Sequence, residues 1–262
     1  MEHKMEDIKI PDFDLSGKVA VITGGTKGLG YGMALTLAKY GADVAISSRT
    51  KADCDRVSDE IRSLGRRSLG VVSDVTIVID NDDLIEKVVA EMGKIDIMIC
   101  NAGTATTAMA VDMTEDQWDT VIDTDLKGVF FSARAAARAM IKQETGGRIV
   151  LVASAAAVSG QPGLTNYCAA KAGVVNMGRA LAVEWARYGI TVNSLCPGYV
   201  PTSINEALWK DPAFTSMIMK HTPLRRLGTI DEVAAAILYL VSDFSGYMTG
   251  SFLLIDGGGA AS

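Results

Sequence analysis

Tyr167 and Lys171 are spaced so that both side chains can serve one reaction. They stand four residues apart in an Ala-rich segment without a helix breaker, so a helix places them on one face, one turn apart. A phenol is a weak acid or base near neutral pH, but a neighbouring cation favours the phenolate and suits the group to general acid–base catalysis. Taken alone, the pair also fits an ordinary amphipathic helix in which Lys171 extends over a packed ring.

Ser154 opens the segment that contains this pair, and it directly follows an apolar stretch over residues 148–153. That stretch predicts a buried strand, and ligands of open α/β sheets bind at the carboxyl ends of their strands. We therefore expect the Ser154 hydroxyl to lie near the bound ligand. The alternative is a hydroxyl packed within an Ala-rich segment.

The elements that must position these residues alternate along the chain. Apolar stretches predict strands, and the segments between them have helical periodicity. We expect a single-domain α/β protein over residues 1–262, with a Rossmann-type doubly wound parallel sheet of about seven strands and helices on both faces. Strands are predicted at about 18–23, 44–48, 68–73, 95–99, 148–153, 190–195 and 251–255, and helices at about 28–40, 51–64, 81–92, 115–142, 165–188 and 230–242.

Two segments fall outside this alternation. Residues 1–15 predict a solvated N-terminal tail, and residues 199–227 contain three prolines and an interrupted helical pattern near 205–210. Loops of this length inside a compact domain are usually functional or disordered. We interpret residues 199–227 as a substrate-loop lid.

Composition and charge exclude several classes of protein. The net charge of −6 lacks the basic signature of a nucleic-acid-binding protein, and the sequence has no run long and apolar enough to predict a membrane span. The four cysteines are widely scattered and the only two histidines are His3 and His221, so we expect reduced thiols and no metal site. These features predict a cytoplasmic protein without nucleic-acid or membrane partners.

A glycine-rich loop follows the first predicted strand. Gly24, Gly28 and Gly30 lie between that strand and the next helix, where backbone N–H groups and the helix N-terminus can approach a pyrophosphate. The alternative is a purely structural turn. The residues expected to contact the cofactor here are Gly24, Thr26, Lys27, Gly28, Leu29 and Gly30.

The end of the second predicted strand indicates which nucleotide binds. An NAD site would place an acidic residue there for the ribose 2′-hydroxyl, whereas this chain has Ser48 followed by Arg49, with Lys27 in the glycine loop. Two cations suit a 2′-phosphate, which predicts NADP(H) as cofactor. The alternative is that both cations are ordinary solvated side chains.

Several motifs, in order along nearly the whole chain, closely resemble the classical short-chain dehydrogenase/reductase family. Ser154 stands thirteen residues before Tyr167, as the catalytic serine of that family does. The resemblance implies further cofactor contacts from Asp74 and Val75, from Asn101, Ala102 and Gly103, and from Pro197, Gly198, Val200 and Thr202. The segments Thr249–Gly250 and Asp256–Gly258 resemble the C-terminal strand of the family.

The resemblance implies hydride transfer between a nicotinamide and a carbonyl or alcohol substrate. Tyr167 is then the proton donor to the alkoxide, Ser154 hydrogen-bonds the same oxygen, and Lys171 binds the cofactor ribose. The chain departs from the family at Asp125, where Asn usually organises a water relay to the lysine. We expect Asp125 to act as a catalytic residue in that relay, and the alternative is a structural carboxylate.

The sequence indicates the type of reaction more clearly than it indicates the substrate. The general pattern resembles gluconate 5-dehydrogenase and related sugar or polyol oxidoreductases. A 3-ketoacyl-carrier-protein reductase is the alternative, although Phe131 and Val183 replace its usual docking arginines; Arg134, Arg179 and Arg187 lie nearby. An NADP-binding sensor that has lost turnover is the non-enzymatic alternative. Family resemblance also implies a homotetramer, formed through Ala- and Gly-rich helices at about 115–142 and 165–188.

Overall fold

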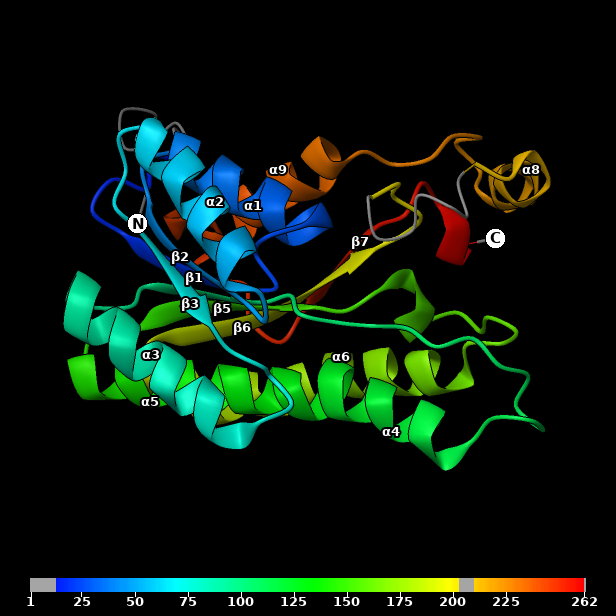
Figure 1. Cartoon of the computed structure of the whole chain (residues 1–262), viewed down its shortest axis with the longest axis horizontal. Coiled ribbons are helices and arrows are strands. Elements are labelled where there is room, and N and C mark those ends of the chain that lie inside the picture. Colours follow the sequence, from blue (N-terminus) through cyan, green and yellow to red (C-terminus); the bar gives the residue numbers. More distant parts are fainter. Residues whose placement is uncertain (1–12, 203–209, 262) are drawn as a thin grey trace, which may run out of the picture.

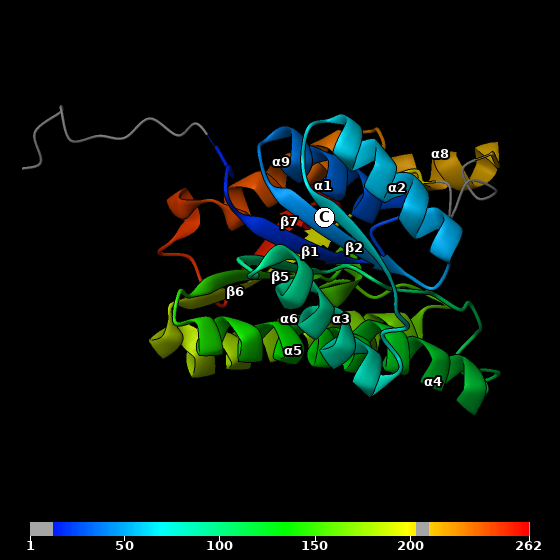
Figure 2. The ribbon, with the colours of Figure 1, turned by 60° about the vertical axis from the view of Figure 1, so that its left-hand side comes forward.

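The computed structural model describes residues 13–202 and 210–261, which form one twisted parallel sheet between two layers of helices (Figures 1 and 2). The seven strands lie in the order β3-β2-β1-β4-β5-β6-β7. They are β1 (Val19–Thr23), β2 (Asp43–Ser48), β3 (Ser68–Val72), β4 (Ile97–Cys100), β5 (Gly147–Val152), β6 (Ile190–Pro197) and β7 (Phe252–Ile255). The predicted doubly wound parallel sheet is therefore confirmed.

Helices cover both faces of the sheet. In Figure 1, α1 (Gly28–Lys39), α2 (Lys51–Ser63) and α9 (Ile230–Val241) lie on one side, and α3 (Val78–Met92), α5 (Val129–Gln143) and α6 (Thr165–Trp185) lie on the other. The same two layers are visible in the turned view of Figure 2. Each layer buries its own apolar cluster against the sheet, which explains why strands such as β1 and β4 are buried at every position.

The order of the strands determines where a ligand can bind. β1 pairs with β2 on one side and with β4 on the other, so the chain reverses its direction of winding at the β1–β4 boundary. Such a switch point leaves a crevice at the carboxyl ends of the strands. The glycine loop after β1 and the segment after β4 both begin at this edge.

Most predicted elements are observed within a few residues, with two informative differences. α3 begins at Val78, earlier than the predicted start near Asn81. The predicted long helix is α4 (Glu115–Ile122), a π-helical turn (Asp123–Gly128) and α5 in succession. Thr114 begins α4 with a capping box that includes Gln117.

The expected lid is only partly described. Residues 203–209, which hold most of the helical piece predicted near 205–210, lie outside the described residues, as do residues 1–12 of the predicted tail. After this gap, Asp211 caps α8 (Pro212–His221) by accepting a hydrogen bond from the Ala213 amide. The segment after α8 is tied to the C-terminal part of the chain, because Leu224 N donates to Gly257 O.

Among residues 13–202 and 210–261, no helix has the length and apolar character needed to cross a membrane. All four cysteines are free thiols. Burial raises the pKa of Cys196 to about 11, which disfavours its thiolate near neutral pH.

Candidate active site

Lys171 is held beneath the Tyr167 ring on the first turns of α6. Its side chain is almost completely buried, with 3% of the residue exposed, and Nζ lies 5.5 Å from the centroid of the Tyr167 ring. Nζ also donates a hydrogen bond of 3.0 Å to the carbonyl oxygen of Val152 at the end of β5. The predicted one-turn spacing therefore brings the phenol and the ammonium together.

Asp125 faces the same ammonium from the π-helical turn. Its side chain is fully buried, and Oδ2 forms an ion pair of 3.0 Å with Lys171 Nζ. The contact lacks hydrogen-bond geometry, so Oδ2 is left without an aligned donor, whereas Oδ1 accepts a bond of 2.7 Å from Thr104 N. A π-turn is a rare local structure that is frequent at functional sites, and here it contributes the carboxylate to the lysine pocket.

The two charges of this pair shift each other's pKa. Burial raises the pKa of Asp125, and the nearby Lys171 charge opposes that rise only in part. Burial alone lowers the pKa of Lys171, but the carboxylate of Asp125 and the Tyr167 phenol outweigh it and raise the value. Lys171 therefore keeps its positive charge in a site from which water is nearly excluded.

Ser154 lies at the carboxyl end of β5, as the sequence predicts. It caps a short 3₁₀ turn (Ala155–Ala157), where Oγ accepts a hydrogen bond of 3.1 Å from Ala156 N. The hydroxyl proton remains available to a substrate oxygen, because this contact uses Oγ only as an acceptor. The same strand end supplies the Val152 carbonyl to Lys171, so β5 positions both groups.

The glycine loop is packed too closely for larger residues. A Cβ on Gly30 would lie 2.3 Å from Gly24 O and 2.5 Å from Asn101 Nδ2, and Gly24 and Gly28 have φ values of +64° and +55°. The first turn of α1 contains no acidic residue, and Lys27 at its N-cap makes no side-chain capping bond. These features fit the pyrophosphate of a dinucleotide, whose charge favours a helix N-terminus.

Asn101 joins the end of β4 to the end of β1. Its Nδ2 donates to the carbonyl oxygens of Thr23 and Gly24 at 3.0 and 3.2 Å. In return, Thr23 Oγ1 accepts from the amides of Asn101 and Ala102. The next residue, Gly103, lies so close to the lysine pocket that a Cβ there would be 2.9 Å from Asp125 Oδ2. The predicted Asn101–Gly103 motif thus connects the glycine loop to the Asp125–Lys171 pair.

The expected adenosine contacts occupy the ends of β2 and β3. Ser48 and Val72 are register partners at this edge, and Asp74 lies two residues after the end of β3. Asp74 Oδ1 accepts two hydrogen bonds from Thr76, and its amide donates to Asp80, which fixes the loop. Val75 is buried against Gly128, where an added Cβ would lie 2.9 Å from its Cγ2.

The last predicted cofactor segment follows β6. Gly198 N donates to Ile255 O of β7, and a Cβ on Gly198 would lie 2.7 Å from Asp256 Cα, so the two chain segments pack closely here. Val200 is buried, and Thr202 is the last described residue before position 210. Pro197 and Gly198 therefore lie at the same edge of the sheet as Ser154.

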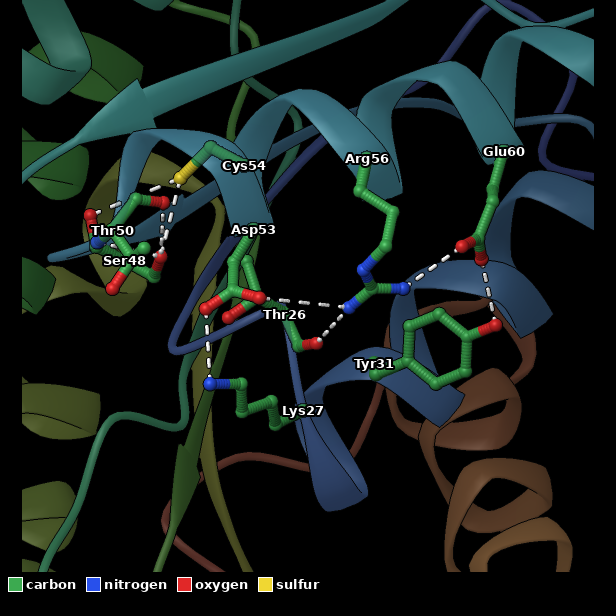
Figure 3. A network of polar contacts seen from close by, with 9 residues as sticks. All are labelled: Thr26, Lys27, Tyr31, Ser48, Thr50, Asp53, Cys54, Arg56 and Glu60. Atoms are coloured by element: carbon green, nitrogen blue, oxygen red, sulfur yellow. Dashed lines mark hydrogen bonds and ion pairs between the residues drawn. The ribbon is translucent and has the colours of Figure 1, made fainter. Parts of the chain in front are cut away.

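Two contributors were not predicted from the sequence. The first is Asn166, which is fully buried and donates from Nδ2 to Thr106 Oγ1 and Gln117 O while its Oδ1 accepts from Tyr167 N. The second is Asp53, which forms a 2.9 Å ion pair with Lys27 (Figure 3). Asn166 could have been noticed in the sequence, because it is a polar residue directly before Tyr167. Asp53 is one of three aspartates in α2, and its spacing in the sequence does not distinguish it from the other two.

The chain matches a family model described as Enoyl-(Acyl carrier protein) reductase over residues 24–259. Among curated proteins, gluconate 5-dehydrogenase of Gluconobacter oxydans is 36% identical over 95% of this chain and 97% of its own length. A 3-oxoacyl-(acyl-carrier-protein) reductase of Thermotoga maritima is 40% identical over 93% of this chain and 98% of its own length.

Solved structures agree with these relatives. A gluconate 5-dehydrogenase of Burkholderia cenocepacia, crystallised with NADP and tartrate, superposes with a TM-score of 0.92 at 34% identity, covering 95% of this chain and 98% of that one. A short-chain type dehydrogenase/reductase of Mycobacterium marinum superposes with a TM-score of 0.91 at 39% identity, covering 95% and 98%. On its sequence, fold and relatives, the chain belongs to the short-chain dehydrogenase/reductase family and is an oxidoreductase acting on alcohol or ketone groups.

Proposed function

We propose that the protein is an NADP(H)-dependent oxidoreductase that interconverts a ketone and a secondary alcohol of a sugar acid, a polyol or a related small carbonyl compound. The observation that carries this proposal is the buried Lys171 ammonium, which is held between Val152 O and Asp125 and lies beneath the Tyr167 ring. An ammonium that keeps its charge near neutral pH beside a phenol is the arrangement that acid–base catalysis by tyrosine needs.

Each residue has a separate task in the reductive direction. The bound nicotinamide cofactor supplies the hydride. Tyr167 donates its hydroxyl proton to the oxygen of the substrate carbonyl as negative charge develops there, and Ser154 donates a hydrogen bond to the same oxygen. Lys171 stabilises the resulting phenolate electrostatically and hydrogen-bonds the cofactor ribose. In the oxidative direction the same groups act in reverse.

Asp125 is proposed to take part in returning a proton to this site. It keeps Lys171 charged, and its unaligned Oδ2 is a free acceptor for a water or for the ammonium itself. The carboxylate retains the acceptor atoms of the usual asparagine but lacks the amide donors, so while ionised it can accept a hydrogen bond from a relay water or from the Lys171 ammonium but cannot donate one.

The sugar-acid class of substrate is supported by the relatives. Gluconate 5-dehydrogenases are prominent among the similar proteins, and one of their structures holds tartrate, a small hydroxy acid. The identity of 40% to an acyl-carrier-protein reductase supports the second candidate. Against it, Arg134 is committed to an ion pair of 2.8 Å with Asp82 and to the face of Phe131, and Val183 is 81% exposed where a docking arginine is expected.

The test is oxidation of NADPH with a panel of keto-sugar acids, simple ketones and acetoacetyl thioesters. Turnover highest with a keto-sugar acid supports the proposal, and turnover highest with a thioester supports the carrier-protein reductase instead. NADPH binding without turnover of any panel member supports the third reading, a sensor that has lost catalysis.

A further inference from the structure

Lys27 of the glycine loop is already paired with an internal carboxylate. Its Nζ lies 2.9 Å from Asp53 Oδ2, across the space between the N-terminus of α1 and the first turn of α2 (Figure 3). The lysine side chain is 54% exposed and the aspartate side chain 22% exposed, so the pair is open to solvent on the lysine side. An incoming anion can therefore reach Lys27 without unfolding the loop.

Neighbouring contacts hold Asp53 and the loop in fixed positions. Arg56 Nη2 donates to Thr26 O at 3.1 Å and lies 4.0 Å from Asp53 Oδ1. Its other terminal nitrogen pairs with Glu60 at 2.8 Å, and Glu60 also accepts a bond of 2.7 Å from Tyr31 (Figure 3). Hydrogen bonding to Tyr31 lowers the pKa of Glu60, which keeps this carboxylate charged for Arg56. The network connects α1, α2 and the glycine loop.

The position of Asp53 relates it to one particular part of the cofactor. α2 begins three residues after the end of β2, and the carboxyl end of β2 is where a dinucleotide-binding fold recognises the substituent on the ribose 2′ carbon. Lys27 is one of the two cations that we assign to a 2′-phosphate. Asp53 places a negative charge 2.9 Å from that cation. A bound 2′-phosphate would add about two further negative charges close to the same lysine.

We propose that Asp53 is a specificity-determining residue that competes with the 2′-phosphate for Lys27 and so limits the preference for NADPH over NADH. The inference rests on the proposed NADP(H) function and deepens it. When the ribose carries a 2′-hydroxyl, Lys27 remains with Asp53. When it carries a phosphate, Lys27 must be shared, and the phosphate meets the repulsion of the Asp53 carboxylate.

The chain offers a matched control for this proposal. Asp55 lies on the same first turns of α2 and pairs with Lys51 at 2.6 Å, but its partner is not in the glycine loop. Asp53→Asn and Asp55→Asn remove the same charge from the same helix. Only the first removes it from Lys27.

The experiment measures binding of 2′,5′-ADP and 5′-AMP by calorimetry to the full-length wild type and both variants. These probes differ in the 2′-phosphate and require neither nicotinamide nor turnover. We expect Asp53→Asn to bind 2′,5′-ADP about three- to tenfold more tightly, with 5′-AMP and the Asp55→Asn values changed by less than about twofold. Adding Lys27→Gln to Asp53→Asn should abolish the gain.

Unchanged or weaker binding of 2′,5′-ADP to Asp53→Asn overturns the inference, because it means that Asp53 orients Lys27 rather than competing for it. An equal gain for 5′-AMP also overturns it. The ratio of the wild-type affinities for 2′,5′-ADP and 5′-AMP tests the proposed cofactor separately. A wild type that binds 5′-AMP as tightly as 2′,5′-ADP contradicts NADP(H) use, while a gain of 2′-phosphate binding in Asp53→Asn still supports the role of Asp53.

Discussion

Lys171 Nζ and Asp125 Oδ2 form a 3.0 Å ion pair in which both side chains are almost wholly removed from solvent. Taking two charges out of water is costly, and the pair is tolerated only because each partner has a further contact, Val152 O for the lysine and Thr104 N for the aspartate. The family's usual asparagine would leave the lysine without a counter-charge. The pH dependence of this enzyme should therefore differ from that of a relative with asparagine.

Asp125→Asn should move the alkaline limb of the rate profile to lower pH. The groups that face Lys171 are Asp125, Tyr167 and Cys196, and Asp125 is the largest of the influences that raise its pKa. Since a raised lysine pKa keeps the ammonium present to higher pH, removing the carboxylate lets burial lower that pKa, and the ammonium is then lost at a lower pH. Activity measured against pH with saturating substrate tests this directly.

Asp125→Ala is the companion to that variant. It leaves a buried ammonium unpaired, which typically costs about 3–5 kcal/mol, so thermal unfolding should occur at a clearly lower temperature than in wild type. If both variants keep the wild-type rate and pH profile, Asp125 has no part in a proton relay and no effect on the charge of Lys171.

Gly30→Ala should weaken cofactor binding while the sheet stays folded. The added Cβ would lie 2.3 Å from Gly24 O, a backbone atom that moves only if the loop moves. We expect affinity for NADPH, measured by fluorescence titration, to fall by more than about tenfold. Gly160→Ala is the control, because its Cβ would meet no atom within 4 Å. Equal affinity in the two variants would contradict the assignment of the loop.

Asn166→Ala should lower turnover more than substrate affinity. The variant loses the bonds that tie the first turn of α6 to Thr106 and Gln117, so Tyr167 is less firmly positioned. Tyr167 N also loses its acceptor, and leaving such a part-buried donor unpaired costs about 1–3 kcal/mol of stability. Asn166→Asp keeps the acceptor for Tyr167 N but not the donors, and should recover only part of kcat. A loss of stability with unchanged kcat and KM would mean that Asn166 is purely structural.

The pattern of apolar stretches was sufficient to predict the sheet, because strands covered on both faces are apolar along their whole length. It also placed Ser154, Tyr167 and Lys171 correctly on their elements, since local spacing determines which face of a helix or end of a strand a residue occupies. The sequence could not predict the π-turn around Asp125, which arises from one additional residue per turn in an otherwise helical segment.

The sequence also could not predict ion pairs between residues that are far apart in the chain. Lys27 and Asp53 belong to different βα units, and only the packing of α2 beside the glycine loop brings them together. The sequence therefore indicated two free cations for a 2′-phosphate, whereas one of them has an internal counter-charge. Arg49 is exposed directly after the end of β2.

A homotetramer is our expectation for the assembly, based on family resemblance. Light scattering at micromolar concentration should then give about four times the chain mass of 27.7 kDa. A monomeric wild type would contradict the expected tetramer.

The acid–base role of Tyr167 is the centre of the proposed mechanism, and Tyr167→Phe isolates it by removing one hydroxyl. The measurement is the rate of NADPH oxidation with the best keto-sugar acid, together with the dissociation constant of NADPH. We predict that the rate falls by at least about a hundredfold, the lower end of what general acid–base catalysis contributes, while the dissociation constant changes by less than about threefold. A Tyr167→Phe variant that retains more than about a tenth of the wild-type rate would contradict the mechanism.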